Sequence, residues 1–199
     1  MEFESEYISR RRRKKRIKIL LDIFRWIIEI AVAVAIAYFI INIVLEKTPV
    51  YGNSMSPTLE SGDMILIDRF VYKYSKPERF DVIVFKQGGN EHEYYDVKRI
   101  IGLPGETVRI VDGKVYINGD ELTEKINCDD MLVPGTASVN ITLEKGEYFV
   151  LGDNRNNSED SRSADIGNVV TDDIIGKAVI RLNGFSFISK LNVIEDSNE

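Results

Sequence analysis

The sequence predicts a mainly β domain, built as a partly open antiparallel β-barrel or sandwich, behind one N-terminal transmembrane helix. Two observations lead to this fold class. A basic run followed by a long apolar segment occupies the N-terminal part, and short runs rich in β-branched and aromatic residues follow Pro49. These patterns divide the 199 residues into a basic tail over 1–18, an anchor helix over 19–46, a β-domain over 47–184 and a C-terminal tail over 185–199.

The charge of the chain is unevenly distributed. Residues 1–18 carry eight basic and three acidic side chains, a net charge of +5, whereas the other 181 residues carry 18 basic and 29 acidic ones, a net charge of −11. A nucleic-acid-binding body would be basic, so we expect no nucleic-acid partner. With one cysteine, Cys128, and one histidine, His92, the chain has no intrachain disulfide, cysteine-rich zinc site or two-histidine metal motif, and we expect no metal or other cofactor.

The apolar segment has the length and flanks of a membrane anchor. Residues Ile30 to Leu45 contain no charged side chain and one amide, Asn42. As a helix this stretch would span about 24 Å, and extending it back to Trp26 gives about 20 residues, enough for a hydrocarbon core. Because the basic cluster directly precedes the span, we expect the N-terminus to lie in the cytoplasm and the body outside the cell membrane.

Two other interpretations of this segment compete with the anchor. One is a buried core helix, although Ala31 to Ile41 shows no polar face. The other is a cleavable secretory signal, but the following residues 45–49 contain no small-residue cleavage pattern. The sequence therefore favours an uncleaved anchor.

The body contains six runs that are typical of strands: Met64–Asp68, Asp81–Phe85, Val97–Ile101, Thr107–Val111, Lys114–Ile117 and Tyr148–Leu151. Asp112-Gly113 between two of these runs predicts a hairpin, because a primed two-residue turn favours Asp-Gly. Helical periodicity is weak after residue 50, so roughly 135 residues of short strands indicate a sandwich or partly open barrel rather than a parallel sheet.

Three polar segments stand out within this β pattern. The first, residues 52–59, brackets Pro57 with small and hydroxyl residues and can expose a serine hydroxyl beside backbone N–H groups; alternatively it is only a turn before a strand. In the second, Lys98 and Arg99 lie inside an apolar strand, so strand alternation points one of the two cations inward unless the sheet is exposed on both faces. Burial lowers the pKa of a lysine, so that its neutral amine can act as a general base. A lysine on an edge strand in solvent keeps its ordinary pKa and cannot.

The third segment, residues 152–162, carries only polar side chains and glycine after an apolar strand. It has the composition of an ordinary surface loop, but its Asp and Arg residues can pair and make the loop rigid, and its hydroxyls can position an ammonium group. The three segments together supply a nucleophile, a base and an orienting loop without histidine. His92 is the rival base, and its acidic neighbours indicate a solvated position.

These segments resemble the ordered sequence boxes of bacterial type I signal peptidases, serine peptidase family S26. The similarity covers Ser54-Met55-Ser56-Pro57-Thr58-Leu59 and the stretches 79–85, 98–106 and 152–162, and it extends over about residues 15–182 with the basic run and the apolar span. The archaeal and endoplasmic-reticulum branch has histidine at the place of Lys98, so the resemblance is to the bacterial branch. The short spacing between the last two boxes is similar to that of Gram-positive-type members.

The resemblance implies a role for individual residues. Ser54 would be the nucleophile and Lys98 the general base, with Ser158 orienting Lys98 by a hydrogen bond. Asp153 with Arg99, and Asp160 with Arg162, would form a scaffold under the site. The substrate would be held by Met55 and Val97 and by extended segments around Tyr51, Asn53 and Asp96.

One position departs from the pattern of some members, which place a serine hydroxyl in the oxyanion hole two residues before the nucleophile. Gly52 stands at that place in this chain. The hole would then consist of backbone N–H groups, from Ser54 and Gly52. A missing donor costs about 2.7–4 kcal/mol in other hydrolases, so backbone or water has to replace it.

The resemblance implies a membrane-anchored serine endopeptidase with a fold like that of signal peptidases and LexA-type proteins. It would cleave N-terminal signal peptides from exported preproteins after a small residue. Its partners would be preproteins, the lipid bilayer and a secretion translocon. Two alternatives remain open: a self-cleaving LexA-type repressor, which would have a DNA-binding helix pair and no span, and an anchored β-domain that only binds a partner.

Overall fold

The computed structural model describes residues 2–87, 95–124 and 128–188; the side chains of residues 2–14, 16 and 39–43 are outside the description. The chain falls into two compact units, Met1–Val44 and Leu45–Glu199. His92 and the Gly88-Gly89 turn lie outside the described residues.

The first unit is the helix α1, Glu2–Val44, which takes in the basic run as well as the apolar segment. All of its described side chains from Ile17 to Tyr38 are exposed, on every side of the helix. Within the part of the chain that the structure describes, no helix combines the length and apolarity needed to cross a membrane. The side chains of residues 39–43, which belong to the expected span, are outside this description.

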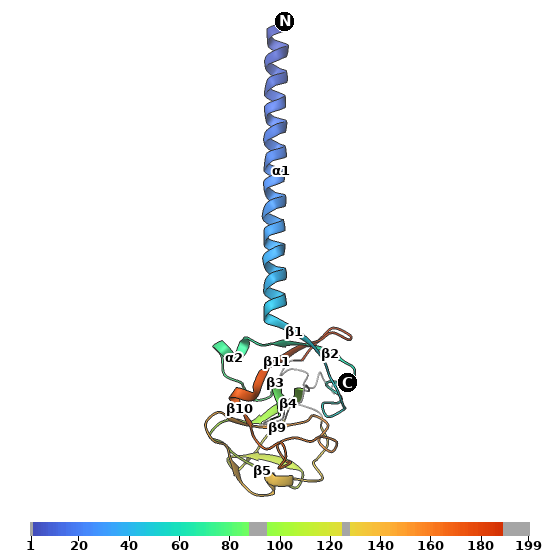
Figure 1. The fold of residues 1–199 in the computed structure, drawn as a ribbon, viewed down its shortest axis with the longest axis vertical. Helices are drawn as coiled ribbons and strands as arrows, with labels where there is room; N and C mark the ends of the chain where they lie inside the picture. The colour runs from blue at the N-terminus through green and yellow to red at the C-terminus, as the bar shows by residue number, and fades with distance from the viewer. Residues whose placement is uncertain (1, 88–94, 125–127, 189–199) are drawn as a thin grey trace, which may run out of the picture. The chain divides into compact units, whose positions relative to one another are not determined.

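The second unit is mainly β, with two antiparallel sheets in its described residues (Figure 1). The larger sheet runs in the order β1 (Leu45–Pro49), β2 (Met64–Asp68), β11 (Ile174–Arg181), β3 (Val82–Lys86), β4 (Tyr95–Gly102), β9 (Glu147–Leu151) and β10 (Val169–Val170), with β12 (Ser186–Phe187) paired to β11. The smaller sheet runs β7 (Asp120–Glu121), β6 (Lys114–Ile117), β5 (Thr107–Val111) and β8 (Ile141–Thr142). Within the described residues of this unit, short helical segments lie between successive strands: α2 (Val71–Tyr74) and η2 (Thr171–Asp173) between strands of the larger sheet, and η1 (Gly135–Ser138) between strands of the smaller one. The prediction of a mainly β, antiparallel domain is confirmed.

All six predicted runs form strands, within one or two residues at each end. The predicted hairpin is β5–β6, with Asp112 at φ 49° and Gly113 at φ 80°, the two positive values that a primed turn needs. The sequence pattern did not indicate β11, which lies between β2 and β3. Gly176 interrupts its apolar pattern, and a Cβ there would lie 2.4 Å from the Asp68 carbonyl oxygen, so close backbone packing requires this glycine.

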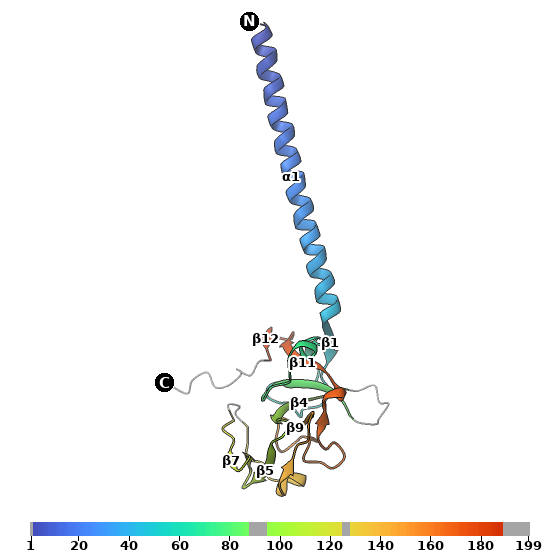
Figure 2. The same cartoon turned by 90° about the vertical axis from the view of Figure 1, so that its left-hand side faces the viewer.

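Strand β4 is the element that carries the site. It lies between β3 and β9, and both views show β4 and β9 between β11 and β5 (Figures 1 and 2). Lys98 and Arg99 point to opposite faces of β4, yet they are only 4% and 2% exposed. The expectation was that one of these two cations points inward, and the structure buries both. Other segments of the protein cover both faces of β4 at this position.

Candidate active site

Ser54 lies in the turn between β1 and β2. The backbone of this turn is closed by hydrogen bonds from Ser56 N to the Asn53 carbonyl (3.2 Å) and from Leu59 N to the Met55 carbonyl (2.9 Å), and the Ser56–Pro57 peptide is cis. Met55 and Leu59 are fully buried in the core. These two apolar anchors hold the turn against the sheet, so that Ser54, between exposed Asn53 and buried Met55, keeps a half-buried hydroxyl.

Lys98 reaches this serine from β4. Its Nζ donates a hydrogen bond to Ser54 Oγ at 3.0 Å, across 44 residues of sequence. Register places Lys98 opposite Ile83 of β3, in the central part of the sheet. The hydroxyl and the amine are therefore within proton-transfer distance in a site that is largely shielded from water.

Burial lowers the pKa of Lys98 below its ordinary value, because desolvation penalises the ammonium form. Three carboxylates oppose this shift: Asp96, whose Oδ1 lies 4.0 Å from Nζ, then Asp160 and Glu159. Since desolvation is the larger effect, Lys98 is a better proton acceptor near neutral pH than a solvated lysine.

Asp153 of the polar loop after β9 contacts both β4 and the serine turn; its pairing with Arg99 was expected, but its hydrogen bond with Thr58 was not. Arg99 makes a bidentate ion pair with Asp153, at 2.8 Å and 2.6 Å, and both side chains are buried. The second oxygen of Asp153 also accepts a hydrogen bond from Thr58 Oγ1 at 2.5 Å. No sequence pattern pairs Thr58 with a carboxylate 95 residues away, although Thr58 belongs to the serine box. We call Arg99, Asp153 and Thr58 the clasp.

The loop also contacts the backbone of the serine turn directly. Asn154 N donates to the Ser54 carbonyl at 3.0 Å, and Asn154 Nδ2 donates to the Asn53 carbonyl at 3.1 Å. With the clasp, these bonds fix the position of Ser54 relative to β4.

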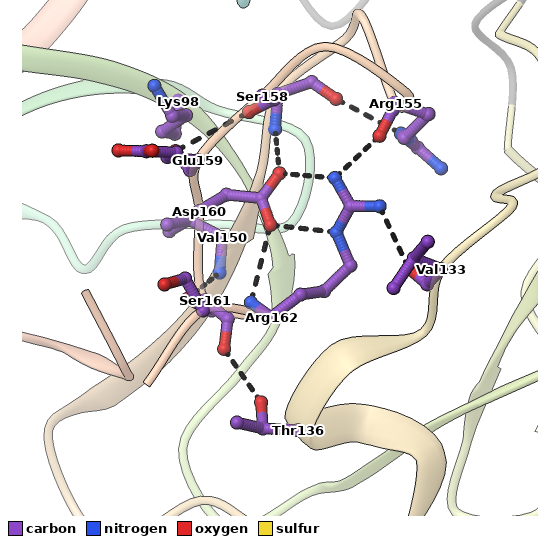
Figure 3. A network of polar contacts seen from close by, with 12 residues as sticks. Lys98, Val133, Thr136, Val150, Arg155, Ser158, Glu159, Asp160, Ser161 and Arg162 are labelled. Atoms are coloured by element: carbon purple, nitrogen blue, oxygen red, sulfur yellow. Dashed lines mark hydrogen bonds and ion pairs between the residues drawn. The ribbon is translucent and has the colours of Figure 1, made fainter. Parts of the chain in front are cut away.

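Asp160 is the centre of the hydrogen-bond network inside the loop (Figure 3). It accepts from the Gly152 amide at 3.0 Å and from two guanidinium nitrogens of Arg162, both at 2.8 Å. Arg162 also donates to the Arg155 carbonyl at 2.6 Å. The buried Arg155 side chain pairs with Glu124, a partner that the sequence did not reveal because the two residues lie 31 positions apart. The expected pair of Asp160 and Arg162 is thus present, and it makes the loop rigid.

Ser158 lies against Gly152 in this loop. A Cβ on Gly152 would fall 2.2 Å from Ser158 Oγ and 2.5 Å from the Ser54 carbonyl oxygen, so this glycine lets three segments meet. The Ser158 hydroxyl donates a long hydrogen bond of 3.5 Å to the Glu159 carbonyl. Among the described residues, Lys98 Nζ donates to Ser54 Oγ and the Ser158 hydroxyl donates to the Glu159 carbonyl, so the expected hydrogen bond between Ser158 and Lys98 is not formed.

The remaining expected residues differ in burial. Met55 and Val97 belong to one buried cluster beside the serine turn, and Asp96 is half-exposed next to Lys98. Tyr51 and Asn53 are exposed. Gly52 has φ +78°, which disfavours any other residue, and no atom lies within 4 Å of its Cβ position.

Two groups of findings bear on metal binding and on the oxyanion hole. Within the described parts of the chain, no cluster of three or more His, Cys, Asp or Glu side chains could hold a metal ion. In those same parts, no hydrogen bond uses the Ser54 amide N–H. That donor is therefore free to bind a developing negative charge beside Ser54 Oγ.

Comparison with known proteins gives the same family as these motifs. The family model described as "Signal peptidase, peptidase S26" matches residues 23–183. A signal peptidase I of Bacillus amyloliquefaciens is 35% identical over 160 residues, which covers 77% of this chain and 81% of that protein. Signal peptidase IB of Staphylococcus aureus (strain COL) is 33% identical over 182 residues, 83% of this chain and 92% of that protein.

A crystal structure of a signal peptidase I from Enterococcus faecalis V583 is 38% identical, with a TM-score of 0.43, and the match covers 53% of this chain and 98% of that one. The family match spans more than half of the chain, and the relatives are matched over most of their length. The chain is therefore a member of the signal peptidase family, peptidase S26, and with it a peptide-bond hydrolase.

Proposed function

We propose that this enzyme removes N-terminal signal peptides from exported preproteins, cutting after a small residue, with Ser54 as nucleophile and Lys98 as general base. The observation that carries the proposal is the 3.0 Å hydrogen bond from a buried Lys98 to Ser54 Oγ. Family membership supports the substrate class, since the matched relatives are named signal peptidase I.

The reaction proceeds by acyl transfer. Neutral Lys98 takes the proton of Ser54 Oγ as the oxygen attacks the scissile carbonyl. The oxyanion binds the unpaired Ser54 N–H, helped by the backbone of Gly52, whose side-chain position is open. Lys98 then gives its proton to the leaving amine, and the acyl-enzyme is hydrolysed by water that Lys98 deprotonates.

Substrate recognition would use the surroundings of the dyad. The buried side chains of Met55 and Val97 line the space for the small residue before the cut. The strand backbone over Asp96–Lys98 would bind the signal peptide as an added β-strand, and the segment Tyr51–Asn53, which bends at Gly52 with φ 78° instead of being extended as expected, would contact it from the side of the serine turn. Asp96 belongs to β4, and Tyr51 and Asn53 are exposed.

We further propose that helix α1 anchors the enzyme in the cell membrane, with the N-terminus in the cytoplasm and the β unit outside. The support is the exposure of its apolar side chains from Ile17 to Tyr38 and the basic run that precedes them. The lipid bilayer would then be a partner. A secretion translocon would deliver preproteins to the same membrane face.

Cleavage of a purified preprotein by single variants tests the dyad. Ser54→Ala and Lys98→Ala should each lower kcat by several orders of magnitude, because neither the nucleophile nor the base has a substitute nearby. Ser56→Ala is the matched control, since Ser56 lies in the same turn and should retain activity. Full activity in Ser54→Ala or Lys98→Ala would contradict the assignment and favour a partner-binding β-domain.

A further inference from the structure

A cavity of about 320 Å³ opens on the polar loop after β9, and the dyad mechanism leaves it unused. Its walls include Leu132, Val133, Arg155, Asn156, Ser158 and Arg162. The volume is at the low end of small-ligand sites, enough for one or two side chains of a peptide.

The cavity adjoins the serine turn at Ser158, one of its lining residues. Ser158 Oγ and the Ser54 carbonyl oxygen both lie within 2.5 Å of one point, the Cβ position of Gly152. A ligand in the cavity therefore lies next to the serine turn. The proposed signal-peptide segments, Tyr51–Asn53 and Asp96–Lys98, are not among the residues that line it.

The polar groups of the cavity are already satisfied. Arg155 pairs with Glu124 and Arg162 with Asp160, so neither guanidinium offers an unpaired charge. Asn156 accepts from the Leu132 amide at 2.9 Å and donates to the Asp130 carbonyl at 3.1 Å. Arg162 also donates to the Val133 carbonyl, as Figure 3 shows. These bonds hold the 132–133 segment rigidly against the loop.

The apolar side chains at the rim of the cavity, in contrast, are exposed to solvent. Leu132 is 82% exposed and Val133 is 67% exposed, on a segment whose backbone is fixed. Covering these two apolar side chains with a ligand removes apolar surface from water and so favours binding. Because their backbone is already fixed, little conformational entropy is lost. The chemistry favours an apolar side chain on an extended peptide.

We infer that this cavity binds the polypeptide segment just after the scissile bond, the new N-terminal end of the mature protein, and prefers an apolar side chain there. The inference rests on the proposed peptidase activity. The proposed signal-side segments do not line the cavity, whereas Ser158, which does, lies close to the serine turn, so we assign the cavity to the leaving segment. Leu132 and Val133 act as specificity residues that contact the substrate.

Peptide cleavage by the full-length enzyme in detergent tests this inference. Three synthetic peptides share one signal-side sequence; the first ends one residue after the scissile bond, the second continues for five residues that include leucines, and the third has serines in place of those leucines. The wild type should cleave the leucine peptide with a several-fold higher kcat/KM than the other two. In Leu132→Ser/Val133→Ser this preference should largely disappear, mainly through a higher KM for the leucine peptide.

The matched control is Val139→Ser, because Val139 is 65% exposed and does not line the cavity. It should leave the preference unchanged. The inference is overturned if the wild type shows no preference for the leucine peptide, or if the double variant keeps the wild-type preference. If the wild type cleaves none of the three peptides, the proposed function itself fails, which is a distinguishable outcome.

Discussion

At the scale of single residues, the proposed chemistry depends on the protonation state of one amine, that of Lys98. Burial in the sheet favours the neutral form of Lys98, and the nearby carboxylates favour the ammonium form. Asp96 is the nearest of these, at 4.0 Å, and it is half-exposed, so it can be changed while Lys98 keeps its hydrogen bond to Ser54. The position of the pH profile should therefore respond to Asp96.

We predict that kcat/KM rises with pH through the Lys98 pKa, because only the neutral amine can accept the serine proton. Asp96→Asn removes the nearest charge that stabilises the ammonium form, which lowers this pKa further and moves the rising limb to lower pH. The measurement is kcat/KM against pH for a peptide substrate, with the exposed Asp120→Asn on β7 as control. A rising limb that stays in place or moves to higher pH in Asp96→Asn would refute the role of this carboxylate.

At the scale of elements, the clasp joins β4, the serine turn and the polar loop. Its ion pair between Arg99 and Asp153 is almost wholly buried, so loss of one partner leaves an uncompensated charge inside the protein. Such losses cost about 3–5 kcal/mol, whereas replacement of both partners by apolar side chains is often neutral. The clasp is therefore expected to matter for stability as well as for catalysis.

Asp153→Ala should lower the free energy of unfolding by about 3–5 kcal/mol, and Arg99→Met/Asp153→Leu should recover most of the loss. Urea-induced unfolding followed by circular dichroism gives both values. Glu121→Ala is the control, since it breaks an exposed pair with Lys114 and should have a much smaller effect. If Asp153→Ala and Glu121→Ala destabilise the protein equally, the clasp does not hold these elements together.

The sequence predicted local features well and long-range partners poorly. Ser54 and Lys98 were proposed from the three polar segments taken together and from the family resemblance, because each segment alone also fits an ordinary turn or a solvated edge strand. Alternation along β4 showed which residues share a face of the strand. It could not show that other segments of the protein cover both faces, and this coverage is the reason that Arg99 is buried. Thr58 and Glu124 were missed for the same reason, since their partners are distant in sequence.

Strand β11 shows the same limit at the level of topology. Its residues alternate only in part between apolar and polar. A glycine such as Gly176 usually disfavours a strand, and here it is explained by the close approach of the Asp68 backbone, which the sequence does not reveal. The predicted hairpin β5–β6, by contrast, needs only its own turn residues. Local chemistry thus predicts hairpins, whereas the placement of a crossover strand between β2 and β3 depends on contacts across the whole domain.

At the scale of the whole molecule, residues 1–18 carry a net charge of +5 and the rest of the chain −11. This difference agrees with the proposed topology, in which the N-terminus lies in the cytoplasm and the β unit outside the membrane. The β unit needs no apolar helix for its core, because its buried clusters come from its own strands and turns. The exposed apolar side chains of α1 therefore require another environment, and the proposed bilayer supplies it.

Membrane association should accordingly depend on the apolar part of α1 and not on its basic end. In bacterial cells, the full chain should remain in the membrane pellet after a carbonate wash, whereas Val34→Asp/Ile36→Asp should move to the soluble fraction, because two carboxylates in the span oppose insertion by several kcal/mol. Lys15→Asp/Lys18→Asp changes the charge by a larger amount outside the apolar segment and should stay in the pellet. If Lys15→Asp/Lys18→Asp is released and Val34→Asp/Ile36→Asp stays in the pellet, α1 binds the membrane surface by charge and does not insert.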